Sequence, residues 1–300
     1  MRNIILSLLF LLPVAMQAQV EIPKTPDGRP AGAQRQGGQM KQPTEFDPNL
    51  NIYLCFGQSN MEGAARPEAV DLGWVDPRFI MMSAIDMPEL GREQRKWYVA
   101  YPPLVRQETG LTPVDYFGRT LVRRLPENVK IGVVCVAVGG ASIDLYNEDI
   151  AEDYISRQAD WFKGFCRNYQ NKPYRRLMEA AKEAMKYGRI RGILLHQGCT
   201  DNGKQDWPDR VKLVYDRMLA ELGLNAQDVP LIVGELGQQD QNAACWHHNS
   251  IIRRLPETIP TARVVSSEGL PLQRDRLHFT ADSYRTFGQR YAEAVMQDYK

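Results

Sequence analysis

The chain has 300 residues, of which 43% are apolar and 24% are charged, so it can bury the core of one large domain. Its 37 lysines and arginines nearly balance its 36 aspartates and glutamates, and it contains no long basic block. This balance argues against nucleic acid or an anionic membrane surface as a partner.

The first 48 residues are expected to lie outside the folded domain. Residues 1–18 combine a positively charged start with an apolar stretch too short to span a bilayer, which is typical of a cleaved signal peptide. Residues 19–48 contain five prolines, four glycines and five glutamines without apolar periodicity, which predicts a disordered or linking arm. We therefore expect a secreted or periplasmic protein, with one domain over 49–300 and no membrane insertion of the mature chain.

Beyond residue 49, apolar runs alternate with helical patterns. Strands are expected near 51–56, 78–83, 130–137, 190–195, 230–234 and 262–266. Helices are expected near 112–125, 174–188, 211–223 and 280–295, the first with a capping box from Thr112 to Asp115 and the last with Thr280 as its cap. The alternation predicts an α/β fold in which helices cover both faces of a parallel sheet.

A serine follows the first predicted strand at once, in the turn Gly57-Gln58-Ser59-Asn60-Met61. A glycine lets the chain bend sharply as it leaves a sheet, and the serine hydroxyl then projects beside the backbone N–H groups of the turn. This placement suits a nucleophile for acyl transfer. Turns of this type also occur in many loops without any chemistry.

A possible base for that serine lies near the other end of the chain, in Asp275-Arg276-Leu277-His278. An Asp and a His held three residues apart in a turn can hydrogen-bond side chain to side chain. The carboxylate would then fix the imidazole tautomer and stabilise the imidazolium. The other three histidines, His196, His247 and His248, have no acid at a useful spacing, and we expect them to be structural.

Two more strands end in turns that could donate hydrogen bonds. Strand 130–137 leads to Gly139-Gly140-Ala141-Ser142, and strand 190–195 leads to His196-Gln197-Gly198. Active sites gather at the carboxyl ends of parallel strands, because the loops that follow converge there. The N–H groups of Ser59 and Gly140 and the Gln197 amide could therefore stabilise an oxyanion. The alternative is that Gly139 and Gly140 merely permit a turn.

These blocks together resemble those of the SGNH hydrolases over roughly residues 50 to 298. More narrowly, they are similar to the carbohydrate-esterase branch, which contains sialate O-acetylesterases and family-six acetylxylan esterases. The resemblance implies a flavodoxin-like three-layer α/β/α sandwich, no metal or other cofactor, and an acetylated poly- or oligosaccharide as substrate.

The resemblance also implies a role for each site residue. Ser59 would be the nucleophile, His278 the general base and Asp275 its orienter. Ser59, a glycine of the 139/140 pair, which we take to be Gly140, and Gln197 would form the oxyanion hole. The neighbours of these residues, Gln58, Asn60, Met61 and Gly139, are expected to contact the substrate.

One residue departs from the family pattern. Members usually carry a glutamate after the His-Gln-Gly triplet, whereas this chain has Cys199. The thiol raises a rival hypothesis in which Cys199 is the nucleophile and His196 its helper, but that hypothesis leaves the Ser59 turn and the Asp275/His278 pair unexplained. The departure also leaves open a glycan-binding protein that has lost turnover, and a lipid esterase of the wider superfamily is a further alternative.

The five cysteines leave at least one thiol unpaired within the chain. Cys55 and Cys135 fall in predicted strands, and Cys199 borders the predicted site. Cys166 and Cys245 are therefore the pair that we nominate for a disulfide. Spacing of the Cys-x-x-Cys type is absent from the sequence, which argues against a zinc site.

Two long connections, near 84–111 and 144–171, are rich in aromatic residues. Aromatic rings stack well on sugar rings, but such residues more often pack their own loop against the core. The residues concerned are Trp97, Tyr98, Tyr101, Tyr146, Tyr154, Trp161, Phe162 and Tyr169.

Overall fold

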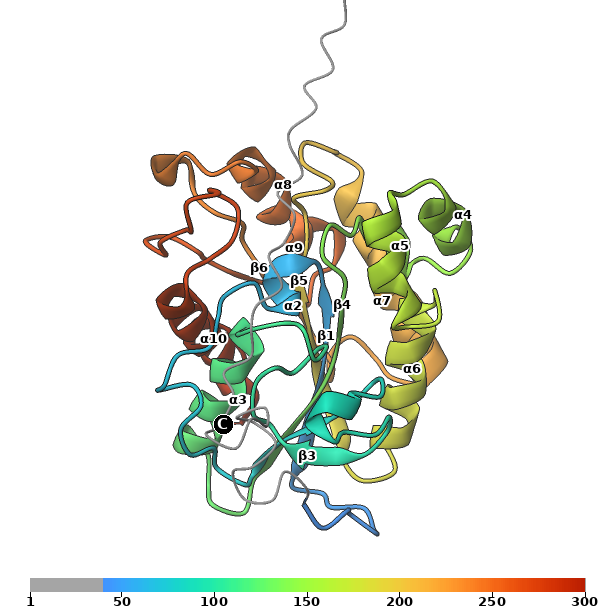
Figure 1. Ribbon diagram of the computed structural model, residues 1–300, viewed down its shortest axis with the longest axis vertical. Helices are drawn as coiled ribbons and strands as arrows, with labels where there is room; N and C mark the ends of the chain where they lie inside the picture. Colours follow the sequence, from blue (N-terminus) through green and yellow to red (C-terminus); the bar gives the residue numbers. More distant parts are fainter. Residues whose placement is uncertain (1–39, 300) are drawn as a thin grey trace, which may run out of the picture.

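A computed structural model describes residues 40–299 of the chain, so the predicted signal peptide lies outside the described residues. The fold is built on a seven-stranded sheet with the order β3-β2-β4-β1-β5-β6-β7 (Figure 1). The strands are β1 (Leu50–Gly57), β2 (Phe79–Met82), β3 (Trp97–Val99), β4 (Lys130–Ala137), β5 (Arg189–His196), β6 (Leu231–Gly234) and β7 (Arg263–Val265).

All six predicted strands are present, and they run parallel to one another. The seventh strand, β3, was not predicted; it pairs antiparallel with β2 at the sheet edge. Its three residues are too few to show an alternating pattern, so tertiary pairing decides their conformation.

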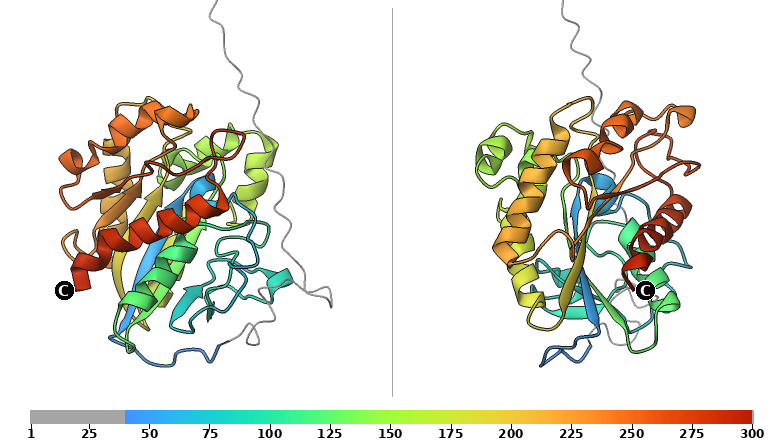
Figure 2. Two further views of the ribbon diagram at one scale, coloured as in Figure 1. Left: turned by 90° about the vertical axis from the view of Figure 1, so that its left-hand side faces the viewer. Right: turned by 180° about the vertical axis from the view of Figure 1, so that it is seen from behind.

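Helices cover both faces of the sheet, giving the expected three-layer α/β/α sandwich (Figure 1). One face carries α3 (Pro113–Arg124) and α10 (Ala281–Val295), which lie side by side in Figure 2. The other face carries α6 (Pro173–Ala184) and α7 (Trp207–Leu222).

The predicted helix signals have the expected effects. The Thr112 hydroxyl accepts from Val114 N, and Asp115 accepts from Thr112 N at 2.9 Å, so the capping box of α3 is complete. Thr280 caps α10 by accepting from Ser283 N at 3.2 Å. Gly223 ends α7 in the left-handed conformation, with φ of 65°.

Shorter elements fill the connections. They are α2 (Ser59–Glu62), η2 (Pro88–Leu90), η3 (Ile143–Tyr146), α4 (Ala151–Ser156), α5 (Asp160–Arg167), η4 (Gln239–Gln241), η5 (Trp246–His248), α8 (Asn249–Ile252), α9 (Leu255–Thr258) and η6 (Met296–Tyr299). The long connection 144–171 therefore carries two helices, α4 and α5, in place of the predicted loop.

The three central strands end at the same level. Gly57 at the end of β1 is in register with Ala137 of β4 and with His196 of β5. The three loops that follow these strands therefore start side by side at one edge of the sheet, where α2 lies in Figure 1.

The last part of the predicted arm, residues 40–48, contacts the domain. The Gln42 side chain donates to Trp97 O and accepts from Trp97 N, both at 2.8 Å, so it pairs with β3 as a short strand would. The contacts of the domain therefore begin before the predicted boundary at residue 49. Within residues 40–299, no helix has both the length and the apolar character needed to cross a bilayer.

Candidate active site

The turn that carries Ser59 depends on a close approach of two backbones. Gly57 ends β1 with φ of 151°, and a Cβ there would lie 2.2 Å from the backbone oxygen of His196. Only glycine fits this position. The chain can therefore bend at once into α2, whose first residue is Ser59.

Ser59, His278 and Asp275 form one continuous hydrogen-bonded series. The Ser59 Oγ lies 2.8 Å from Nε2 of His278, although the two residues are 219 positions apart. The other ring nitrogen, Nδ1, lies 2.6 Å from Oδ2 of Asp275. A carboxylate can only accept here, so Nδ1 carries the proton and Nε2 presents its lone pair to the serine hydroxyl.

The acid of this series is held as a carboxylate. Its second oxygen, Oδ1, accepts from the backbone N–H groups of Leu277 and His278 at 2.9 and 3.0 Å. Burial raises the pKa of Asp275, but the hydrogen bonds from the His278 ring and from these two N–H groups outweigh burial and hold the pKa at about 2.

Asn60 ties the serine turn to the histidine turn. Its Nδ2 donates to Leu277 O at 3.1 Å, and its Oδ1 accepts from Phe279 N at 3.2 Å and from the Tyr284 hydroxyl at 2.6 Å. These bonds fix the distance between the serine hydroxyl and the imidazole. This buried amide, with three protein partners, positions the two turns relative to each other.

The residues that we expected to contact the substrate are enclosed by protein. Gln58, Asn60 and Met61 are at most 2% exposed, and Gly139 is also buried. Ser59 itself is only 3% exposed, so burial alone does not separate these residues from the proposed nucleophile. Contact of these four residues with the substrate stays a prediction.

The turns of Ser59 and Gly140 each carry a backbone N–H group without an acceptor in the described part of the chain. Val138 N donates to Gly57 O at 3.2 Å, which places the Gly139-Gly140 turn against the turn that carries Ser59. Gly140 has φ of 77° and is the more exposed glycine of the pair. Within residues 40–299, neither Ser59 N nor Gly140 N has a backbone or side-chain acceptor, so both can donate to a ligand.

Gln197 does not fit its predicted place in the oxyanion hole. It is fully buried, and its Nε2 lies 2.7 Å from Asp201 Oδ2, 3.1 Å from Ala141 O and 3.3 Å from Gln58 Oε1. Two amide hydrogens already face three acceptors, so none remains for an oxyanion. Gln197 lies in the predicted loop, but its amide joins loops inside the protein.

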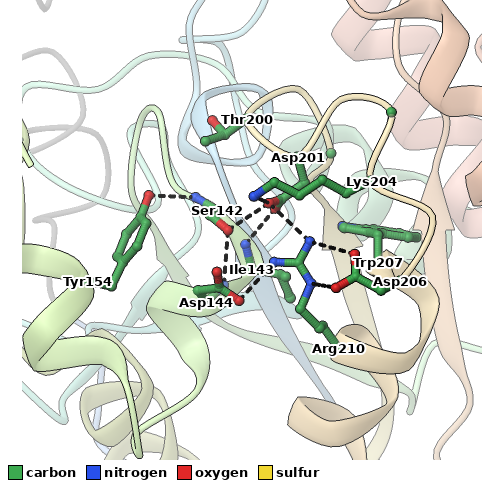
Figure 3. Close-up of polar contacts among 12 residues, drawn as sticks. Ser142, Ile143, Asp144, Tyr154, Thr200, Asp201, Lys204, Asp206, Trp207 and Arg210 are labelled. Atoms are coloured by element: carbon green, nitrogen blue, oxygen red, sulfur yellow. Dashed lines mark hydrogen bonds and ion pairs between the residues drawn. The ribbon is translucent and has the colours of Figure 1, made fainter.

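Asp201, four residues after Gln197, lies at the centre of a network of polar contacts (Figure 3). Its buried carboxylate accepts from Ser142 Oγ, Ile143 N and Lys204 Nζ, each at 2.8 Å. Burial raises the pKa of Asp201, but these hydrogen bonds outweigh burial and lower it. Asp201 thereby holds the loop that contains Gly140 against the loop that follows β5.

The rival nucleophile Cys199 lacks a base. His196 is fully buried, its Nε2 lies 3.0 Å from Glu235 O, and burial lowers its pKa to about 4. A hydrogen bond with Cys245, together with burial, raises the pKa of the Cys199 thiol well above its usual range. Cys199 therefore stays a protonated thiol at neutral pH.

The nominated Cys166–Cys245 pair is wrong. All five cysteines are free thiols, and Cys166 is buried in α5. Cys245 instead faces Cys199. Residues 40–299 also contain no cluster of three His, Cys, Asp or Glu side chains that could hold a metal ion.

An exposed tryptophan borders the site. A Cβ added to Gly140 would lie 2.7 Å from Cη2 of Trp161, so this ring rests directly on the loop. Phe162 and Phe165 hold the ring edge-on, with centroids 5.7 Å away, and 41% of Trp161 remains exposed. Most of the other aromatic residues of the two long connections are buried and pack their loops; they are Trp97, Tyr98, Tyr101, Tyr146, Phe162 and Tyr169.

The fold is shared with solved structures of low sequence identity. A protein from Arabidopsis thaliana is 21% identical, with a TM-score of 0.61 over 85% of this chain and 100% of that chain. The protein NanS is 16% identical, with a TM-score of 0.60 over 85% of this chain and 99% of that chain. A carbohydrate acetylesterase from Xanthomonas citri is 17% identical, with a TM-score of 0.56 over 82% of this chain and 55% of that longer chain.

Family membership follows from the sequence itself. The model of one protein family, described as carbohydrate esterase, sialic acid-specific acetylesterase, matches residues 49–297. This match covers nearly the whole of the described domain, including all the turns that form the site. The chain therefore belongs to this family of carbohydrate acetylesterases, and it is a carboxylic ester hydrolase.

Proposed function

We propose that the protein is a secreted serine esterase that removes O-acetyl groups from a carbohydrate, with Ser59 as nucleophile, His278 as general base and Asp275 as the orienter of His278. The observation that carries this proposal is the unbroken series from Ser59 Oγ to Asp275 Oδ2, with bonds of 2.8 and 2.6 Å. Secretion rests on the signal-like residues 1–18.

Acylation begins when His278 Nε2 takes the Ser59 proton as the serine oxygen attacks the acetyl carbonyl carbon. The carbonyl oxygen becomes an oxyanion that Ser59 N and Gly140 N can stabilise, since neither has another acceptor within residues 40–299. Each such donor lowers the barrier by roughly 3 kcal/mol. The Asp275 carboxylate stabilises the imidazolium formed in this step.

The imidazolium then protonates the sugar oxygen, and the bond between that oxygen and the acetyl carbon breaks. The sugar hydroxyl leaves, and the acetyl group remains on Ser59. Water attacks this acyl-enzyme with His278 again as base, so that acetate is released and the serine is restored.

The sugar is proposed to pack on Trp161. The ring is the exposed aromatic that rests on the Gly140 loop, and the Thr200 hydroxyl, which donates to Gly140 O at 2.9 Å, is exposed beside the same residue. Aromatic faces stack on the apolar faces of sugars, whereas a small acetyl group needs no such surface. The proposed substrate is therefore an acetylated poly- or oligosaccharide, of the acetylxylan or sialate type.

Acetate release from acetylated xylan, acetylated sialoglycan and acetylated pectin tests the function and identifies the glycan class. Wild-type protein is expected to release acetate from at least one of them. Ser59→Ala should lower kcat by at least about 10⁴-fold and leave KM nearly unchanged, because the hydroxyl contributes to bond formation and little to binding. Hydrolysis by Ser59→Ala at the wild-type rate would refute the mechanism.

The same measurements separate an esterase from a glycan-binding protein that has lost turnover. Saturable binding to an acetylated polysaccharide without acetate release would favour the binding protein, despite the complete hydrogen-bonded series. Activity confined to esters of long acyl chains would favour a lipid esterase.

A further inference from the structure

Two thiols face each other across neighbouring loops beside the site. Cys199 follows β5 by three residues, and Cys245 immediately precedes η5. The Sγ of Cys245 lies 3.6 Å from the backbone oxygen of Cys199. Both residues are partly exposed, whereas Cys55, Cys135 and Cys166 are buried.

The backbones that carry these thiols are fixed close together. Gly198 has φ of 149°, and a Cβ there would lie 2.5 Å from Cδ2 of His248. The same imidazole accepts from Gly203 N through Nδ1 at 3.3 Å. His248, three residues after Cys245, thus packs against both ends of the Cys199 loop and holds the two cysteine-bearing loops beside each other.

The Cys245 loop also supports the turn that carries Asp275 and His278. Ala244 N donates to Arg276 O at 2.9 Å, and Gln241 Oε1 accepts from Leu272 N at 3.0 Å. On the other side, the carboxylate of Asp275 contributes to the raised pKa of the Cys199 thiol. A covalent link between the two thiols would therefore join the loop after β5 to the Cys245 loop, which is hydrogen-bonded to the turn of Asp275 and His278.

We propose that Cys199 and Cys245 are a disulfide site, oxidised by exchange with a small-molecule disulfide. The Cys245 thiolate attacks one sulfur of the reagent, whose sulfur–sulfur bond breaks and releases one thiolate. Cys199 then loses its proton and attacks the Cys245 sulfur of the mixed disulfide, releasing the second thiolate. The two leaving thiolates take up the two protons, so the protein thiols are oxidised and the reagent is reduced.

Cys245 is proposed to act first because the contact with Cys245 and burial raise the pKa of the Cys199 thiol. The attacking thiol needs thiolate character, and the partner reacts once it is held at the mixed disulfide. The resulting bridge would join residues 46 positions apart and restrict the unfolded chain.

Oxidised glutathione added to the purified full chain tests this site. The protein is then alkylated under denaturing conditions and digested without reduction. The expected product is one peptide pair joining Cys199 to Cys245, lighter by two hydrogens than the separate peptides, with the other three thiols alkylated. The melting temperature of the oxidised protein should be higher than that of the reduced protein.

Three variants sharpen the result. Cys199→Ser should stop at a glutathione adduct on Cys245, Cys245→Ser should lose the bridge, and the control Cys166→Ser should form it as wild type does. Any of three results in wild type would overturn the proposal. They are a persistent glutathione adduct, full alkylation of both Cys199 and Cys245, and a bridge from Cys245 to Cys166. Peptide mapping of wild type decides the question even if a serine variant fails to fold.

Discussion

At the scale of single residues, Asp275 shows how one carboxylate can both shape a turn and orient a base. One oxygen accepts two backbone N–H groups of its own turn, and the other accepts from the His278 ring. Its pKa of about 2 means that it stays charged in the folded protein above that pH. Its contribution to stability is therefore complete above about pH 4 and is lost as the pH falls towards 2.

Asp275→Asn is expected to lower kcat by roughly 10²- to 10⁴-fold with little change in KM, because an amide neither fixes the tautomer nor stabilises the imidazolium. Steady-state kinetics of wild type and variant at one pH measure both constants. A variant as fast as wild type would show that His278 does not depend on this carboxylate.

Trp161→Ala is expected to raise KM for an acetylated oligosaccharide by roughly 5- to 10-fold, since an aromatic contact contributes about 1 kcal/mol. KM for a small ester such as ethyl acetate should not change, because that substrate has no sugar ring. Trp74→Ala is the matched control, as Trp74 is an exposed tryptophan (66%) outside the described site. A sugar-stacking role would be contradicted if Trp161→Ala raised KM equally for both substrates. It would also be contradicted if Trp74→Ala raised KM for the oligosaccharide as much as Trp161→Ala does.

The sequence predicts some residues of the candidate site better than others, and burial explains the difference. Ser59 and the Asp275/His278 pair stand out because spacing alone places them in turns. Gln197 and Asn60 occupy the predicted turns, but their amides point into the protein and bind other loops. Whether an amide in a turn faces a ligand or another loop depends on tertiary contacts that spacing does not encode.

At the scale of elements, the capping box of α3 contains an unusual acid. Asp115 is fully buried, and burial raises its pKa to about 7, although the bond from Thr112 N and the charges of Arg119 and Arg92 oppose the rise. Because the folded-state pKa lies above the unfolded value near 4, the folded protein binds more protons between about pH 4 and 7. Stability due to this group therefore falls as the pH rises through that window.

Asp115→Asn should remove this pH dependence while keeping an oxygen that accepts from Thr112 N. This pH dependence is measured by urea unfolding of both proteins at pH 5, 6 and 7. The free energy of unfolding of the variant minus that of wild type should increase by up to about 1.4 kcal/mol per pH unit. If the difference in the free energy of unfolding between variant and wild type stays constant from pH 5 to 7, Asp115 is already charged in the folded state.

The longer elements could be predicted because their signals are local. Thr112, Thr280 and Gly223 mark helix ends through bonds and backbone angles within a few residues. By contrast, β3 has three residues and gains its conformation from pairing with β2, and α5 has eight residues that mix buried and exposed side chains. For such short elements, packing outweighs local preference.

At the scale of the whole molecule, sheet order brings distant residues together. The sequence predicts six parallel strands but not that β4, β1 and β5 are neighbours whose ends are level. This order places the turns of Ser59, Gly140 and Gln197 side by side. The turn that precedes α10 joins them from 219 positions away, held by Asn60.

A fluorophosphonate probe, followed by peptide mass mapping, tests most directly whether Ser59 is the nucleophile. Such a probe reacts with a serine only where a base and an oxyanion hole activate it. We predict one adduct, on Ser59, that is absent in Ser59→Ala and strongly slowed in His278→Ala. An adduct on another serine or on Cys199, or labelling of wild type no faster than of His278→Ala, would contradict the mechanism.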